Sequence, residues 1–141
     1  MLSNKKGYRG YIVSRPVDDH RVPQHIQNVV IREYAEKREM QYLLSVTEYS
    51  MSGSYLILEQ ALDELSGIEG IILYSMFALP ALPAQRLSIY RRVLDAGCSL
   101  HAAVERFALR GEEDIERWEN VLITAALCGD VNYKQIEEWL T

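Results

Sequence analysis

Residues 70–80 read Gly-Ile-Ile-Leu-Tyr-Ser-Met-Phe-Ala-Leu-Pro, and this stretch decides the fold. A short run of β-prone apolar residues lies between a glycine and a polar, aromatic segment that ends in proline, which is the pattern of a strand buried on both faces. Such strands occur in the middle of parallel sheets that have helices above and below. The stretch therefore predicts an α/β fold. Tyr74, Ser75 and Phe77 fall at the carboxyl end of the strand, where open α/β folds bind their ligands.

The rest of the chain alternates strand and helix patterns. Short connections and right-handed crossovers predict a three-layer sandwich with a four-stranded parallel sheet in the order 2-1-3-4. We expect a single domain over residues 1–141, with an α/β core over 1–110 and a C-terminal helical extension over 111–141. The expected strands are residues 8–13, 41–45, the run that begins at Gly70, and 99–104; the expected helices are 23–39, 55–65, 84–96, 112–128 and 132–140, with a loop over 46–54.

Composition and charge narrow the function classes. The 141 residues are 48% apolar and 25% charged, as in an ordinary globular domain, and the net charge of −5 argues against a nucleic-acid partner that needs a basic face. No apolar run is long enough to span a bilayer and no signal-peptide core follows the N-terminus, so a cytoplasmic location without a membrane span is expected. Cys98 and Cys128, like His20 and His25, lack metal-ligand spacing. We therefore expect no metal and no cofactor.

Polar side chains follow each predicted strand. Because the carboxyl ends of parallel strands meet at one edge of a sheet, these groups are expected to converge there. A convergent set of carboxylates, an arginine, hydroxyls and aromatic rings is what a small-molecule pocket requires. The set comprises Ser14 and Arg15 after the first strand, Ser45, Glu48 and Tyr49 after the second, Tyr74 and Ser75 after the third, and Glu105 and Arg106 after the fourth.

Each candidate catalytic group has a structural alternative. Glu48 and Glu105 are candidates for general acid–base catalysis, and the alternative is that each carboxylate caps backbone N–H groups. Ser14 is a candidate nucleophile, which needs a base within hydrogen-bond reach; the alternative is a cap or a hydroxyl that contacts the ligand. Arg15 could hold a phosphate or carboxylate with its planar guanidinium, or could form a structural ion pair with one of the two glutamates.

Amide side chains crowd the start of the first predicted helix. Gln24 and Asn28 are four residues apart and share a helix face, with Gln27 beside them. Because the N-terminus of this helix is expected to point toward the pocket, these amides are candidates for holding a phosphate or sugar hydroxyls. The alternative is a solvated helix face. Tyr49, Tyr74 and Ser75 complete the expected ligand contacts.

Several stretches of the sequence, in one order along nearly its whole length to about residue 120, match a known family. They are Lys6-Gly7-Tyr8-Arg9-Gly10-Tyr11-Ile12 with Ser14-Arg15, Val22-Pro23-Gln24-His25-Ile26-Gln27-Asn28, Ser45-Val46-Thr47-Glu48-Tyr49, and Tyr74-Ser75-Met76-Phe77-Ala78-Leu79-Pro80. In these stretches the chain resembles the sporadic carbohydrate cluster proteins, a bacterial family. This family takes its name from its occurrence among genes for surface-polysaccharide and sugar-nucleotide synthesis, so the resemblance implies carbohydrate metabolism without a defined reaction.

A second, more distant resemblance rests on Tyr11-Ile12-Val13-Ser14, Gln27, Ser52-Gly53 and Glu105. It is to the catalytic domain of serine recombinases. This chain departs from the recombinase pattern in three ways: Ser14 comes one residue early, Glu59 lies near the place of a loop arginine, and residues 75–80 contain no arginine. Since phosphodiester transfer needs several cations around the phosphate, the resemblance implies a resolvase- or flavodoxin-like fold and not recombination.

These observations lead to two main hypotheses. The first is a small enzyme that acts on a sugar or sugar phosphate in cell-surface carbohydrate biosynthesis by isomerase- or lyase-like acid–base chemistry. The alternative is a non-catalytic protein of the same pathway that senses a ligand or acts as a scaffold; a degenerate recombinase-like DNA-binding protein is a third. A carbohydrate ligand and a homo-oligomer are the expected partners, the latter because the terminal helices carry Trp118 and Trp139.

Overall fold

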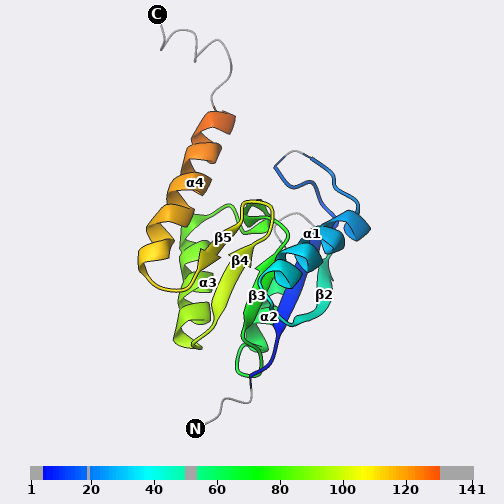
Figure 1. The fold of residues 1–141 in the computed structure, drawn as a ribbon. Helices are drawn as coiled ribbons and strands as arrows, with labels where there is room; N and C mark the ends of the chain where they lie inside the picture. The colour runs from blue at the N-terminus through cyan, green and yellow to red at the C-terminus, as the bar shows by residue number, and fades with distance from the viewer. Residues whose placement is uncertain (1–4, 19, 50–53, 131–141) are drawn as a thin grey trace, which may run out of the picture.

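The computed structural model describes residues 5–18, 20–49 and 54–130, which form an α/β domain (Figure 1). The expected helix 132–140 with Trp139 and the Ser52-Gly53 pair lie outside the described residues. The strands are β1 (Tyr8–Val13), β2 (Tyr42–Glu48), β3 (Gly70–Leu73), β4 (Ser99–Ala102) and β5 (Phe107–Leu109); the helices are α1 (Gln24–Lys37), α2 (Leu56–Asp63), the 3₁₀ turn η1 (Met76–Ala78), α3 (Pro83–Asp95) and α4 (Glu113–Asp130).

The sheet is mixed and has the order β2-β1-β3-β4-β5. The predicted α/β class is confirmed, but the prediction of a four-stranded, wholly parallel sheet is wrong. Strands β1 to β4 run parallel, and β5 pairs antiparallel with β4 through Leu100 with Leu109 and Ala102 with Phe107. The fourth strand ends at Ala102 rather than 104, and Arg106 turns the chain back with a positive φ of 59°. The sequence does not predict β5, because a three-residue strand is too short to give a period.

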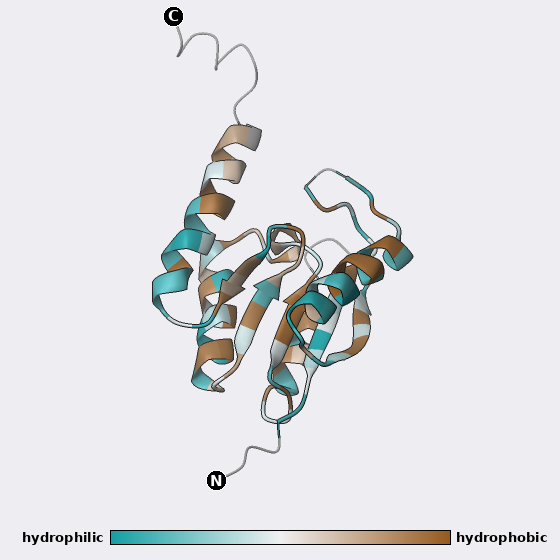
Figure 2. Ribbon diagram, in the orientation of Figure 1, coloured by the Kyte–Doolittle hydropathy of each residue, from teal (hydrophilic) through white to brown (hydrophobic). Residues whose placement is uncertain are grey.

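Helices cover both faces of the sheet, as predicted from the apolar run at Gly70. Ile12 of β1 and Ile72 of β3 pack with Ile31 of α1 on one face. On the other face, Ile71 and Leu73 belong to a larger core with α2 and α3. The hydropathy colouring shows the apolar strands between these helices (Figure 2). Strand β3 therefore contributes to both cores, and all four of its residues are buried.

Helix α4 joins the larger core on the side of α3. Trp118 is fully buried there, with its ring edge-on to that of Tyr90 at a centroid distance of 6.0 Å. Trp118 therefore packs on its own chain and gives no support to a subunit interface. Ile123 and Leu127 are exposed on the later turns of α4, so the homo-oligomer stays a prediction.

The second strand is longer than its sequence pattern indicates. The sequence predicts a loop from residue 46, but β2 continues through Glu48 and pairs there with Val13 of β1. The pairing has a register irregularity between Arg9 and Tyr11, which local sequence does not signal. This extension brings Glu48 to the carboxyl edge of the sheet beside β1.

Substitution of Gly70 by alanine is expected to lower the free energy of unfolding by about 1–3 kcal/mol, because overpacking displaces neighbouring atoms. A Cβ at this position would lie against the backbone carbonyl of Ser99 in β4, well inside van der Waals contact, and backbone atoms cannot turn away as a side chain can. Urea unfolding monitored by circular dichroism measures the change. Gly67→Ala is the control, because a Cβ there meets its nearest neighbour at 3.8 Å; equal stability of the two variants would contradict the expectation.

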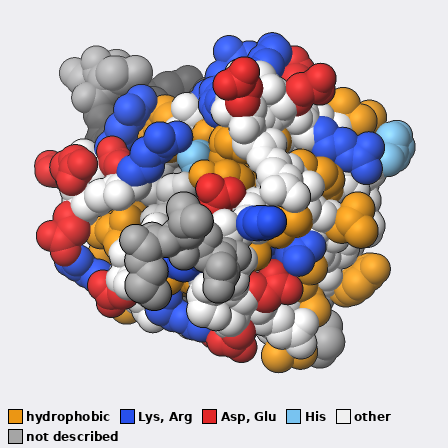
Figure 3. All heavy atoms as spheres, turned by 60° about the horizontal axis from the view of Figure 1, so that its bottom comes forward, with side chains coloured by type: hydrophobic (Ala, Val, Ile, Leu, Met, Phe, Trp, Pro, Cys, Tyr) orange, Lys and Arg blue, Asp and Glu red, His pale blue; other side chains and the backbone are white. Residues whose placement is uncertain are grey.

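Two further features concern the surface. Among the described residues, no helix combines the length and apolar character needed to cross a membrane. Seen with the lower edge of Figure 1 turned forward, acidic and basic side chains are interspersed on the visible face (Figure 3). The face in that view therefore carries no single basic patch.

Candidate functional site

A small pocket opens at the carboxyl ends of β1, β3 and β4. The chain leaves β1 through α1 on one face of the sheet and leaves β3 through α3 on the other, so the two neighbouring strands form the topological switch point at which such folds bind ligands. The pocket has a volume of about 160 Å³. Its walls are Val17, Asp18, His20 and Val22 of the β1–α1 loop, Tyr74, Ser75 and Phe77 after β3, and Val104 and Glu105 after β4.

Glu105 and Ser75 form the polar wall of this pocket. The Ser75 hydroxyl donates to Glu105 Oε2 at 2.7 Å, and the Met76 N–H donates to Oε1 at 2.9 Å. Ser75 Oγ in turn accepts from the Phe77 N–H at 3.1 Å, which caps the start of η1. The carboxylate thus holds the turn after β3, and it remains half-buried at the pocket wall. The sequence predicts both residues at one edge, and the structure brings them into contact.

Tyr74 lines the same pocket. Its backbone N–H donates to the Tyr11 carbonyl at 3.0 Å, which continues the pairing of β1 and β3 by one residue. Burial, together with the negative charge of Glu105, raises the pKa of Tyr74. The hydroxyl is therefore protonated near neutral pH and can donate a hydrogen bond to a ligand oxygen.

Glu48 lies at the same edge but is committed to the fold. The side chain is buried, and its Oε1 accepts from the Tyr11 hydroxyl at 2.9 Å and from the Leu58 N–H at 3.1 Å. Oε2 accepts from the Ile57 N–H at 3.0 Å. Burial and the charge of Glu48 raise the pKa of Tyr11, which keeps its hydroxyl a donor. Glu48 caps the first turn of α2, as the structural alternative proposed, and does not line the pocket.

Among the described residues, Arg15 forms an ion pair with neither of the two glutamates expected as its partners. One guanidinium nitrogen donates to the Ala78 carbonyl at 3.1 Å, and the group lies over the Tyr55 ring at 4.6 Å. Arg15 therefore connects the segments that follow β1 and β3 with the start of α2. It stays half-exposed at the edge of the sheet and outside the pocket walls.

Gln27 uses its amide inside the protein. The side chain is fully buried: its Oε1 accepts from the Val13 N–H at 3.0 Å, and its Nε2 donates to the carbonyls of Val13 and Val22 at 2.7 and 2.9 Å. Gln27 thereby ties α1 to the end of β1 and shapes the β1–α1 loop. A fully engaged buried amide has no donor left for a ligand.

The remaining candidates are spread around the edge. Gln24 is exposed at the first position of α1, and Tyr49 is 67% exposed. Asn28 is half-buried and accepts from the Tyr42 hydroxyl at 3.3 Å. Ser14 has a buried Oγ without a hydrogen-bond partner among the described residues, so no base is in reach to activate it. None of these four side chains lines the pocket.

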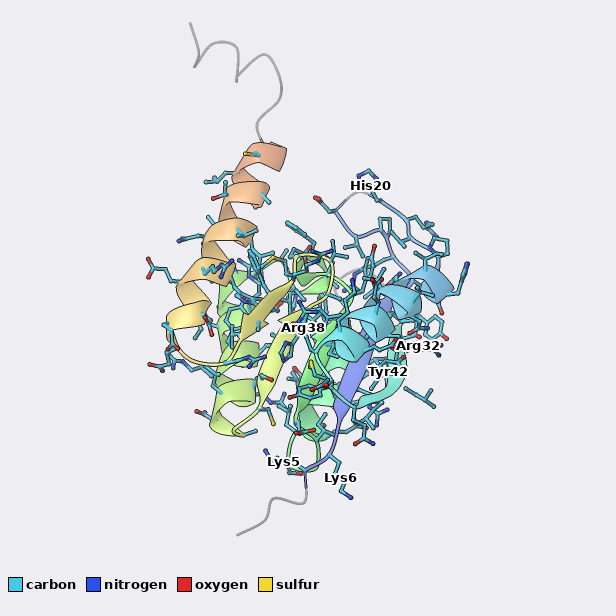
Figure 4. All side chains as sticks on the ribbon, viewed as in Figure 1. Lys5, Lys6, His20, Arg32, Arg38 and Tyr42 are labelled. Carbon is cyan, nitrogen blue, oxygen red and sulfur yellow. The ribbon has the colours of Figure 1, made fainter. Side chains whose placement is uncertain are left out.

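Sequence reasoning missed the contribution of the β1–α1 loop. Asp18 has a positive φ of 50°, and Val17 and His20 pair across this tight turn through two backbone hydrogen bonds. The turn holds His20 at the carboxyl edge of the sheet (Figure 4). The signal for the turn is the Asp-Asp pair at 18–19, because aspartate tolerates left-handed turns. The spacing of His20 from His25 bears only on metal binding and does not indicate this position.

A second histidine, His101, is buried on the α1 face of the sheet. Its Nδ1 is 2.7 Å from the Tyr34 hydroxyl and its Nε2 is 2.8 Å from Ser99 Oγ. Burial, and secondarily the positive charges of Arg110 and Arg38, lowers the pKa of His101 to about 3. The ring is therefore neutral in the folded protein near neutral pH.

The depressed pKa of His101 predicts a loss of stability in mild acid. The unfolded chain binds a proton near pH 6.5 and the folded chain only near pH 3, so His101 stabilises the fold fully above pH 6.5 and progressively less as the pH falls toward 3. Between pH 7 and 5 the loss is about 2 kcal/mol. Urea unfolding at both pH values measures it. The free energy of unfolding of His101→Gln should fall by less than that of wild type between pH 7 and 5. An equal fall in both proteins would contradict the assignment of this pH dependence to His101.

No group of three or more histidine, cysteine, aspartate or glutamate side chains is placed to hold a metal ion in the described ranges 5–18, 20–49 and 54–130. Comparison with known proteins found no matching family model, no matching curated protein and no matching solved structure.

Proposed function

We propose that the chain binds a small, hydroxyl-rich ligand of the carbohydrate class in the switch-point pocket. The observation that carries the proposal is the juxtaposition there of Tyr74, Glu105 and His20, which come from three different segments. A tyrosine hydroxyl donor, a carboxylate acceptor and an imidazole match the alternating donors and acceptors of a sugar. The Phe77 ring offers an apolar surface to the carbon face of a sugar.

The size of the pocket limits the ligand. Its volume of about 160 Å³ is below the roughly 300–1,000 Å³ of sites for drug-sized molecules. A single monosaccharide unit is therefore the largest group that we expect to enter. A role in cell-surface carbohydrate biosynthesis rests on the family resemblance of the sequence.

Binding without turnover is the function that the geometry supports best. Glu48 accepts three hydrogen bonds inside the fold, and Glu105 accepts a backbone N–H and a serine hydroxyl. These hydrogen bonds hold each carboxylate in place as an acceptor within the fold. This arrangement supports a ligand-sensing or scaffold protein.

An isomerase- or lyase-like activity is the second candidate. It is favoured by one observation: Glu105 and Tyr74 line the same pocket, and the charge of Glu105 helps to keep the Tyr74 hydroxyl protonated. In that case Glu105 would accept a proton from the sugar and Tyr74 would donate one to a substrate oxygen.

Thermal-shift and calorimetric titration of the protein with monosaccharides and sugar phosphates tests the binding proposal. Tyr74→Phe is expected to weaken binding of the best ligand by roughly tenfold, because a buried acceptor of the ligand loses its donor. Tyr49→Phe is the matched control, since Tyr49 is exposed and lies outside the pocket. Equal affinity of the Tyr74→Phe and wild-type proteins would remove the pocket from consideration.

Glu105→Gln separates the two candidate functions. Glutamine can still accept from the Met76 N–H, and the Ser75 hydroxyl can accept where it previously donated, so we expect the fold to persist. A ligand converted by wild type and bound but not converted by this variant would favour catalysis. Ligand recovered unchanged from both proteins would favour binding alone.

A further inference from the structure

A groove lies between α1 and the β4–β5 hairpin, on the face of the sheet opposite α2 and α3. Its volume is about 380 Å³, within the range of small-molecule sites. Arg38, at the end of α1, lies between this helix and β4 (Figure 4). The residues that line the groove are Val30, Glu33, Tyr34, Lys37, Arg38, Ala103, Val104 and Arg106.

The charge of this groove is opposite to that of the chain. Lys37, Arg38 and Arg106 line it against the single carboxylate of Glu33, whereas the chain as a whole carries a net charge of −5. Arg110 is also close, because its positive charge acts with that of Arg38 on the pKa of His101 beneath. A concave site with an excess of cations concentrates small anions.

Arg106 is held at the groove by the turn between β4 and β5. Its φ of 59° is in the left-handed region, which a residue with a side chain adopts at a cost. Within the part of the chain that the structure describes, the exposed Arg106 side chain forms no hydrogen bond or ion pair. Its guanidinium therefore retains all its donors for a ligand.

The other two cations are positioned by α1. The Arg38 guanidinium lies over the Tyr34 ring at 3.7 Å and donates one hydrogen bond to the Tyr34 carbonyl at 3.2 Å, which fixes its plane and leaves further donors. Lys37 pairs with Glu33 at 2.8 Å on the surface of the helix. The positive charge of Arg106 also acts on Glu33 and helps to lower its pKa, so the three cations that line the groove outnumber its one carboxylate by two.

We propose that this groove binds a small anionic molecule that carries a phosphate or carboxylate group. Arg106 and Arg38 bind the charged group by charge-assisted hydrogen bonds. Val30, Ala103 and Val104 provide an apolar wall for the rest of the molecule. The groove lies apart from the switch-point pocket except at Val104, which borders both, so this site stands whether or not that pocket binds a sugar.

Calorimetric titration of the full chain with inorganic pyrophosphate and with malonate, at low ionic strength, tests the proposal. Saturable binding that weakens as salt is added is expected for at least one probe. Tighter binding of pyrophosphate assigns the site to phosphate, and tighter binding of malonate assigns it to carboxylate. No saturable binding of either probe would overturn the proposal.

Arg106→Gly is the decisive variant. Glycine adopts a positive φ without strain, so the turn should persist while the guanidinium is removed, and probe affinity should fall by roughly tenfold. Arg91→Gln is the control: it removes the same charge from α3, where Arg91 pairs with Glu112, and should leave the affinity unchanged. Equal losses in both variants would show non-specific attraction and overturn the site.

Glu33→Gln provides a test with the opposite sign. Removal of the carboxylate takes away a repulsive charge and releases Lys37, so probe affinity should rise by about threefold to tenfold. Unchanged or weaker binding in this variant would place the anion elsewhere and overturn the proposal.

Discussion

Replacement of Glu119 by alanine is expected to lower the free energy of unfolding by about 3–5 kcal/mol, the usual effect of leaving a buried charge without its partner. Glu119 of α4 accepts from Arg86 Nε at 2.8 Å and from a terminal guanidinium nitrogen at 2.9 Å, and Tyr90 donates to the same carboxylate at 2.6 Å. The Arg86 side chain is only 5% exposed. Urea unfolding at pH 7 measures the loss.

A matched control separates this buried pair from ordinary surface pairs. Glu112 forms an ion pair with Arg91, and both side chains are more than half exposed. Glu112→Ala should therefore change the free energy of unfolding by less than about 1 kcal/mol. Similar losses in the Glu119 and Glu112 variants would contradict the assigned role of the buried pair.

The lowered pKa of Glu119 predicts that its contribution to the free energy of unfolding decreases in acid. Burial alone would raise the pKa of Glu119, but hydrogen bonds from Arg86 and Tyr90 outweigh it and lower the pKa below its usual value near 4.5. Its stabilisation is then fully present above about pH 4.5 and is lost as the pH falls through the lower, folded-state pKa. The difference in free energy of unfolding between wild type and Glu119→Gln should therefore become smaller as the pH falls below about 4.5.

This buried pair also supports the candidate site. Arg86 donates to the carbonyls of Pro80 and Ala81 at 3.0 and 2.8 Å, so it fixes the segment between η1 and α3. That segment follows Phe77, which forms part of the pocket wall. The pair thus joins α3 and α4 and fixes the segment that follows Phe77 in the chain.

Local patterns predict the parts of the fold that depend on local physics. The run at Gly70 is apolar on both faces, so it has to be a central strand between two layers of helices. The order of the first four strands follows from short connections and the handedness of crossovers. Because parallel strands end at a common edge, the order of residues along the chain is enough to place Tyr74, Ser75 and Glu105 together.

Local patterns do not predict which hydrogen-bond or ion-pair partner each polar side chain has. Glu105 meets Ser75 across 30 residues, and Arg86 meets Glu119 across 33. Such pairings depend on the positions of whole elements, and residue type alone allows both a capping and a catalytic role. Gln27 illustrates this: the sequence predicts its place at the start of α1, but the rotation of the helix turns its amide into the protein.

Replacement of Glu48 by alanine is expected to lower the free energy of unfolding by about 3 kcal/mol, the combined effect of one lost helix cap and one buried hydroxyl without a partner. The Ile57 and Leu58 N–H groups at the start of α2 would lose their acceptors, and so would the buried Tyr11 hydroxyl. Urea unfolding measures the total, and amide hydrogen exchange at residues 57 and 58 localises the loss to α2.

Glu48→Gln sharpens the distinction between a structural and a catalytic glutamate. Glutamine has one acceptor oxygen in place of two, so its NH₂ group must face a group that now donates a hydrogen bond to Glu48. We therefore expect the free energy of unfolding to fall by about 1–3 kcal/mol. Glu105→Gln should lower the free energy of unfolding by less, because the Ser75 hydroxyl, which donates to Glu105, can instead accept from the glutamine NH₂ group. If instead Glu48→Gln kept full stability and abolished ligand conversion, Glu48 would be the catalytic group and the reactive centre would lie beside α2.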